Sequence, residues 1–140
     1  MSDDLRTAFE ATDYRVFLDG DSHVLRIGAP CPEPIARWLT DRAFADCAWL
    51  ITAYNPNAKQ IDEASNRARH ALLRDWADRR ASAWLETVNE DPIGDWPDEP
   101  GVLVAGIEKG EVHSMSARLE QGAIVFVPSE ANVRLVFLVG

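Results

Sequence analysis

A short apolar run, a turn and a long helical segment occupy the middle of the chain. The run Ala48-Trp49-Leu50-Ile51-Thr52 is bounded by turn signals, as expected of a buried central strand. Asn55-Pro56-Asn57 interrupts the chain soon after it. Asp62 can cap a helix that continues to Arg80. The remaining segments must therefore be arranged around this strand–turn–helix unit.

The long segment from Asp62 to Arg80 has an apolar arc at helical spacing. Asn66 and Arg69 are neighbours three residues apart, and both fall at the border of that arc. A polar residue at such a border can line a pocket instead of pointing into open water. At 100° per residue, the arc contains Ala64, Ala68, Ala71, Leu72 and Trp76.

The other segments alternate between strand-like and helix-like patterns. A hairpin is expected over 14–27, strands over 83–88, 101–107, 123–127 and 133–138, and helices over 5–10, 33–44 and 111–119. Strand pairs alternating with helices predict an α+β fold, with a mixed sheet of about five to seven strands and about three helices. We expect one domain over 1–140, with 1–12 as a loosely packed N-terminal segment.

The composition restricts the class of protein and its chemistry. A chain of 140 residues can bury roughly 68–70 % of its unfolded surface, so it needs no disulfide or metal to fold. Cys31 and Cys47 are the only cysteines, and the three histidines lie in different segments. This spacing matches no metal-ligand pattern, so we predict no metal and no cofactor.

The charge and the terminal sequence predict a cytoplasmic protein that binds neither nucleic acid nor a membrane. The net charge is −9, which opposes general binding to a polyanion. No apolar run approaches the ~18 residues that span a bilayer, and Met1-Ser2-Asp3-Asp4 lacks the features of a secretory signal. The segment 59–80 is nevertheless basic, with six Lys/Arg and four Asp/Glu. It could hold a small anionic ligand, although a solvated helix face is the more common explanation.

No motif of a known catalytic class occurs, but polar residues are found at the ends of the expected elements. Each has a structural alternative: a turn-forming side chain for Asn55, an ion pair for Arg69 and Glu99, a helix cap for Gln121. For any one residue we favour the structural alternative. The candidates are Thr52, Asn55, Asn66, Arg69, Glu99 and Gln121.

Four blocks of this sequence resemble an uncharacterised bacterial family, the domain of unknown function 3293. They are Ile51-Thr52-Ala53-Tyr54-Asn55-Pro56, Asn66-Arg67-Ala68-Arg69, Trp96-Pro97-Asp98-Glu99 and Gln121-Gly122-Ala123-Ile124-Val125. The typical pattern of that family is I-T-A-x-N-P, N-x-x-R, W-x-x-E-x-S and Q-N-A-I-V. The resemblance adds Trp96 to the candidate residues and supplies no reaction.

The chain departs from that pattern at three positions. Gly101 stands where the pattern has serine, Gly122 where it has asparagine, and Ala58 where a serine is common. If those side chains take part in binding, this chain binds weakly or has lost the activity.

Two functions remain open, and whether the protein is an enzyme is left undecided. In the first, a small-molecule pocket lies at the end of the 48–52 strand, with Arg69 holding an anionic group and Asn55 and Asn66 orienting it. Trp96 would cover the ligand, and Glu99 would be the single weak candidate for a general base. In the second, a basic protein partner meets an acidic surface made by Glu90, Asp91, Asp95, Asp98 and Glu99. We further expect the candidate residues to surround one concavity, with Glu99 as the acceptor for Arg69.

Overall fold

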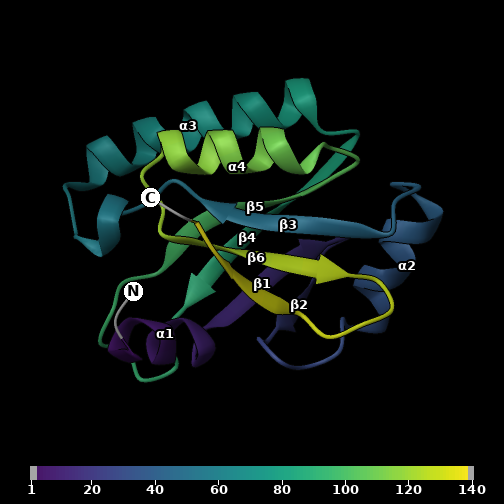
Figure 1. Ribbon diagram of the computed structural model, residues 1–140, viewed down its shortest axis with the longest axis horizontal. Coiled ribbons are helices and arrows are strands. Elements are labelled where there is room, and N and C mark those ends of the chain that lie inside the picture. Colours follow the sequence, from purple (N-terminus) through teal and green to yellow (C-terminus); the bar gives the residue numbers. More distant parts are fainter. Residues whose placement is uncertain (1–2, 139–140) are drawn as a thin grey trace.

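Over residues 3–138, seven strands form one curled sheet, and helices lie against both of its faces (Figure 1). The computed structural model describes residues 3–138, so Met1 and Ser2 of the expected loose segment lie outside it. The helices are α1 (Asp3–Glu10), α2 (Glu33–Asp41), α3 (Glu63–Arg80) and α4 (Lys109–Arg118), with a 3₁₀ turn at Pro56–Ala58. The strands are β1 (Asp13–Leu18), β2 (Asp21–Leu25), β3 (Cys47–Thr52), β4 (Ala83–Glu90), β5 (Glu99–Ala105), β6 (Ala123–Pro128) and β7 (Arg134–Phe137).

The order of strands across the sheet is β2-β1-β4-β5-β3-β6-β7, and every neighbouring pair of these strands is antiparallel. The predicted α+β class and the strand number are confirmed, but the prediction of a mixed sheet is wrong. The reason is that β5 separates the parallel strands β3 and β4, and β3 separates β5 and β6. The central part, β3-α3-β4-β5-α4-β6, is therefore a pair of interleaved split βαβ units.

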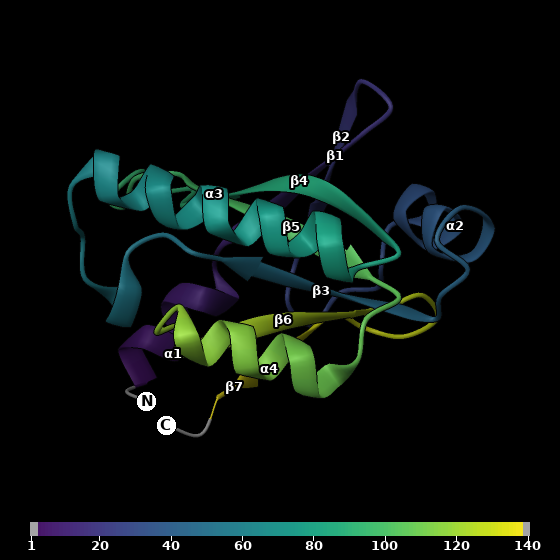
Figure 2. The same cartoon turned by 90° about the horizontal axis from the view of Figure 1, so that it is seen from above.

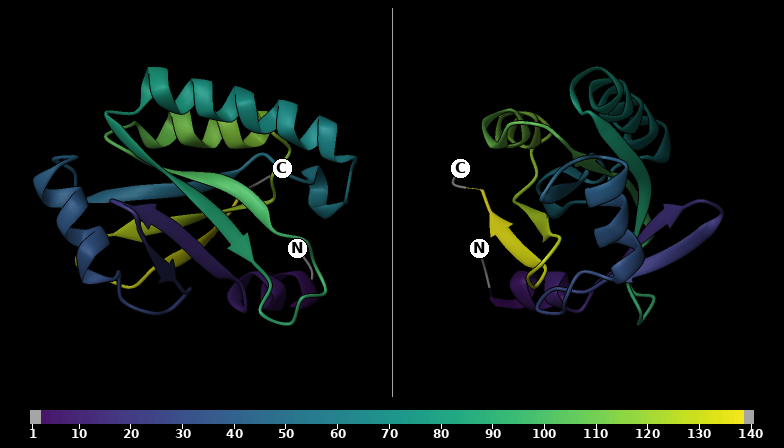
Figure 3. Two further views of the ribbon diagram at one scale, coloured as in Figure 1. Left: turned by 180° about the vertical axis from the view of Figure 1, so that it is seen from behind. Right: turned by 90° about the vertical axis from the view of Figure 1, so that its right-hand side faces the viewer.

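Alternation along the strands divides the core between the two faces of the sheet. Trp49 and Ile51 point toward α3 and α4, which lie side by side over one face (Figure 2). Leu50 points the other way, into a cluster that includes Ile35 and Leu39 of α2. Helices α1 and α2 lie on this second face (Figure 3). The two helices that lie outside the split βαβ core within residues 3–138, α1 and α2, are thus on the face opposite α3 and α4.

The long helix begins as predicted but buries a different stripe. Asp62 caps α3 by accepting a hydrogen bond from the Ser65 backbone N–H at 2.9 Å. The residues that α3 buries are Asn66, Leu73 and Ala77, whereas Leu72 of the predicted arc is 63 % exposed. Asn66 therefore lies on the buried side of the helix and not at its border.

None of the helices described over 3–138 is both long and apolar enough to cross a membrane.

Candidate functional site

A cavity of about 860 Å³ lies on the face of the sheet that α1 and α2 occupy. Its walls come from α1, the ends of β3 and β5, the 91–98 loop, and strands β6 and β7. Of the predicted site residues, those that line it are Thr52, Asn55, Trp96, Glu99 and Gln121. Asn66 and Arg69 are not among the lining residues, although both bind residues that are close to it.

Glu99 is a carboxylate of the cavity wall that two neighbouring side chains position. Its Oε2 atom accepts hydrogen bonds from Asn55 Nδ2 at 2.8 Å and from Trp96 Nε1 at 3.0 Å. Its Oε1 atom accepts no hydrogen bond from the residues of 3–138. This atom is not among the buried polar atoms that lack a partner, so it is accessible, and Glu99 lines the cavity. Burial raises the pKa of this carboxyl, and the bonds from Trp96 and Asn55 oppose that rise.

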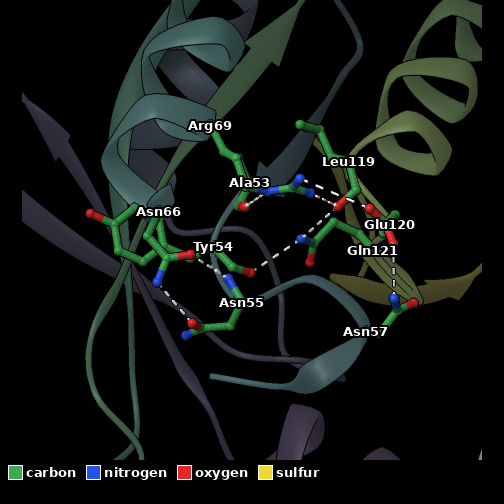
Figure 4. A network of polar contacts seen from close by, with 9 residues as sticks. All are labelled: Ala53, Tyr54, Asn55, Asn57, Asn66, Arg69, Leu119, Glu120 and Gln121. Atoms are coloured by element: carbon green, nitrogen blue, oxygen red, sulfur yellow. Dashed lines mark hydrogen bonds and ion pairs between the residues drawn. The ribbon is translucent and has the colours of Figure 1, made fainter. Parts of the chain in front are cut away.

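Asn55 and Asn66 hold each other in a reciprocal pair that is almost inaccessible to solvent (Figure 4). The Asn55 backbone N–H donates to Asn66 Oδ1 at 2.8 Å, and Asn66 Nδ2 donates to Asn55 Oδ1 at the same distance. The Ile61 backbone N–H donates to Asn55 Oδ1 as well. Asn55 has a left-handed backbone with φ of 50°, a conformation that asparagine adopts more readily than most residues. The pair therefore fixes the turn after β3 against α3 and leaves Asn55 Nδ2 directed at Glu99.

Arg69 joins the turn after β3 to the end of α4 (Figure 4). Its Nε donates to the Ala53 carbonyl oxygen at 3.0 Å, and its Nη2 donates to the Leu119 carbonyl oxygen. Its Nη1 lies 4.0 Å from a carboxylate oxygen of Glu120. The predicted pairing of Arg69 with Glu99 is therefore wrong, because backbone carbonyls and Glu120 take up the guanidinium.

The end of α4 forms the far side of the same network. The Gln121 and Glu120 N–H groups donate back to Ser116 and Ala117, which is the Schellman pattern of helix termination. Glu120 occupies its left-handed position with φ of 59°, where glycine is usual. The Glu120 backbone carbonyl and carboxylate both accept hydrogen bonds from Asn57. This contact links the Pro56–Ala58 turn to the end of α4.

Gln121 and Thr52 satisfy backbone groups beside the cavity. Gln121 Nε2 donates to the Tyr54 carbonyl oxygen at 3.2 Å. Thr52 Oγ1 donates to the Pro100 carbonyl oxygen and accepts from the Tyr54 N–H. These donor groups are therefore committed to fixing the strand ends, whereas Glu99 Oε1 has no such partner among residues 3–138.

The sequence alone did not indicate Glu120 or Asn57, although both line the cavity. A signal existed for Asn57, since it repeats the turn chemistry of Asn55 across a proline. Glu120 gave no such signal because a glutamate in a left-handed position contradicts its usual preference. The α1 residues Leu5 and Phe9 were also missed, since a short N-terminal helix does not show what it covers.

The three departures from the resembled pattern have different surroundings. Ala58 and Gly122 line the cavity. At Gly101, a Cβ atom would lie 2.6 Å from the Ile51 carbonyl oxygen and 2.9 Å from Thr87 Oγ1. A serine at 101 therefore requires a shift between β5 and β3, so this departure concerns strand packing.

A model of a protein family matches residues 51–124, which is more than half of the chain. The chain belongs to the family described as Protein of unknown function (DUF3293). The matched segment contains every residue of the predicted site, whereas α1 and β7 lie outside it. Comparison with curated proteins gives no match, and comparison with solved structures gives none either.

Proposed function

We propose that this DUF3293 protein binds a small molecule in the cavity between α1 and the sheet. One observation carries the proposal: the Glu99 carboxylate is fixed by two donors in a wall of a cavity of about 860 Å³. Small-molecule sites typically have volumes of roughly 300–1,000 Å³, with mainly apolar walls and a few placed polar groups. Phe9, Leu50 and Val125 supply apolar walls of this kind.

The residues of the family segment support this role by positioning the carboxylate. Asn66 orients Asn55, Asn55 donates to Glu99, and Trp96 donates to the same oxygen. Arg69 and Gln121 hold the neighbouring backbone. A network that fixes one carboxylate while leaving one of its oxygens accessible is suited to orienting a ligand.

The alternative of an acidic protein-interaction surface has less support. Of the acidic residues expected to form that surface, Glu90 pairs with Arg15 at 2.9 Å. The Asp91 carboxylate accepts hydrogen bonds from backbone N–H groups of its own loop. Glu99 is turned toward Asn55 and Trp96. These contacts leave Asp95 and Asp98 as the exposed acids of the loop.

A fragment screen by ligand-observed NMR tests the proposal. Ala8 is an exposed residue of α1 that lines the cavity, and Glu10 is an exposed residue of α1 that does not. We expect fragments that bind the natural chain to lose binding in Ala8→Trp, whose indole fills the cavity mouth, and to keep it in Glu10→Trp. Binding that Ala8→Trp leaves unchanged, or an absence of hits, would reject the proposal.

A further inference from the structure

The charged side chains of 3–138 that line the cavity are all carboxylates. Arg69 is the cation of the predicted site, but it binds Ala53, Leu119 and Glu120 and is not among the residues that line the cavity. The described residues that line the cavity therefore include no lysine, arginine or histidine that could bind the predicted anionic ligand. An anion would enter a field of its own sign, which disfavours its binding. The carboxylates belong to Asp4, Glu90, Asp91, Asp95, Glu99 and Glu120.

Several of these carboxylates already have partners that satisfy them. Glu90 pairs with Arg15, and Glu120 lies 4.0 Å from Arg69 and accepts a hydrogen bond from Asn57. Asp91 accepts three backbone hydrogen bonds within its loop. Their charge is thus wholly or partly compensated before a ligand arrives.

Glu99 differs because both of its donors, an amide and an indole, are electrically neutral. No ion pair with a residue of 3–138 compensates its charge, and its Oε1 atom accepts no hydrogen bond from those residues. A partly buried carboxylate in this state gains most from a cationic donor, because charge-assisted hydrogen bonds are about twice as strong as neutral ones. Its pKa, raised mainly by burial, agrees with a carboxylate that lacks a cationic partner.

The walls around Glu99 determine the rest of the ligand. Leu50, Val125 and Leu135 of the sheet lie on one side and Phe9 of α1 on another. A hydrated inorganic cation would gain nothing from such walls. An organic body would gain roughly 25 cal/mol for each Å² of apolar surface that it buries.

From this combination, which rests on the proposed binding function, we infer the class of ligand. We propose that the cavity binds an organic amine with an apolar body, whose ammonium group pairs with the accessible oxygen of Glu99. The apolar body lies between α1 and the sheet. The acidic lining attracts the cation and excludes the corresponding anion.

Three probes with one apolar body test the inference: 4-phenylbutylamine, 4-phenyl-1-butanol and 4-phenylbutyrate. Isothermal titration calorimetry near pH 7 compares their dissociation constants. We expect the amine to bind at least roughly tenfold more tightly than the alcohol, which corresponds to about 1.4 kcal/mol, and the acid to bind most weakly. The preference should fall as salt is added, since ions screen the acidic lining.

Two variants, each lacking one negative charge, test whether the preference for the amine over the alcohol depends on Glu99. Glu99→Gln keeps an oxygen that can accept from Asn55 and Trp96, and we expect it to bind the amine no better than the alcohol. Asp98→Asn changes an exposed neighbour that does not line the cavity, and we expect it to retain the preference. Thermal melting of both variants verifies that each is folded.

The outcomes separate the inference from the proposed function. Equal binding of amine and alcohol, tighter binding of the acid, or an amine preference that survives in folded Glu99→Gln would overturn the inference and leave small-molecule binding in place. Failure of all three probes to bind the natural chain at millimolar concentration would count against the proposed function, and the inference would fall with it.

Discussion

At the scale of single residues, the site is mostly a set of side chains that satisfy backbone groups. Arg69 and Gln121 donate to carbonyl oxygens, and Asn66 accepts from the N–H of Asn55. Such bonds are needed where a strand ends, because a buried backbone group without a partner costs about 1–3 kcal/mol. Glu99 is the exception, since one of its oxygens accepts two bonds while the other is left accessible.

Arg69→Ala should destabilise the fold, because the Ala53 and Leu119 carbonyls would lose a charged donor. We expect the free energy of unfolding to fall by about 1.5–3 kcal/mol in urea titrations. Arg69→Lys should recover little, since an ammonium cannot reproduce the planar fork of the guanidinium. Arg67→Ala, an exposed position on the same helix, is the matched control and should change stability by less than about 0.5 kcal/mol. Equal losses at 67 and 69 would contradict a structural role for Arg69.

Glu99→Gln should change how stability depends on pH. Burial raises the pKa of Glu99 in the folded chain, so the folded state binds its proton more tightly than the unfolded state does. The contribution of Glu99 to stability is therefore most favourable below the unfolded pKa of about 4.3, and it is lost as the pH rises through the folded pKa. The glutamine variant has no such proton, so its stability relative to the natural chain should increase from pH 4 to pH 7.

Urea titrations of both chains at those two pH values provide the measurement. A stability difference that does not change with pH would show that burial has no effect on the ionisation of Glu99. The Asp98→Asn variant, altered at an exposed position, supplies the baseline.

At the scale of elements, the type of each segment was predicted better than the pairing of the strands. The runs 48–52 and 101–107 and the helix after Asp62 were identified from periodicity and capping, and the structure has them as β3, β5 and α3. The sheet order was beyond such reasoning, because alternation shows which faces are buried and not which strand is the neighbour. The insertion of β5 between β3 and β4 turned an expected mixed sheet into an antiparallel one.

The location of the candidate residues was predicted better than the identity of their partners, for a related reason. The positions of Asn55, Glu99 and Gln121 at the ends of elements placed them around one cavity. Their partners depended on helix rotation, and the polar sequence of α3 defined its buried side poorly. Asn66 was therefore expected at the border of the helix, and Arg69 was paired with the wrong carboxylate.

The α1 helix covers the cavity, and its attachment can be tested apart from the fold. The Tyr14 hydroxyl donates to the Phe9 carbonyl oxygen at 3.0 Å, near the end of α1. Tyr14→Phe removes this bond, so we expect faster amide hydrogen exchange over residues 3–12 with little change in exchange of the central strands. Tyr54→Phe removes a hydroxyl bond to Glu63 elsewhere and should leave exchange in α1 unaltered. Unchanged exchange in Tyr14→Phe would show that other contacts hold α1.

At the scale of the whole molecule, the charges are arranged so that the basic segment does not form a basic surface. The net charge is −9, and acidic partners neutralise much of α3. Arg74 pairs with Glu86 at 3.1 Å and Arg79 with Asp75 at 3.0 Å, and Arg80 pairs with Glu111. Each surface pair is worth little in stability, but together they remove the continuous positive face that a polyanion requires.

Duplex DNA should therefore bind weakly or not at all near physiological salt. We expect no sub-micromolar binding in fluorescence anisotropy titrations at about 0.15 M salt, where the Debye length is about 8 Å. The triple variant Asp75→Lys, Glu86→Lys, Glu111→Lys replaces the three partners and raises the net charge by six units. If the paired carboxylates suppress binding, this variant should gain measurable affinity that falls steeply with added salt, because each new phosphate contact releases counterions. Sub-micromolar binding by the natural chain would show that a basic surface exists despite these pairs.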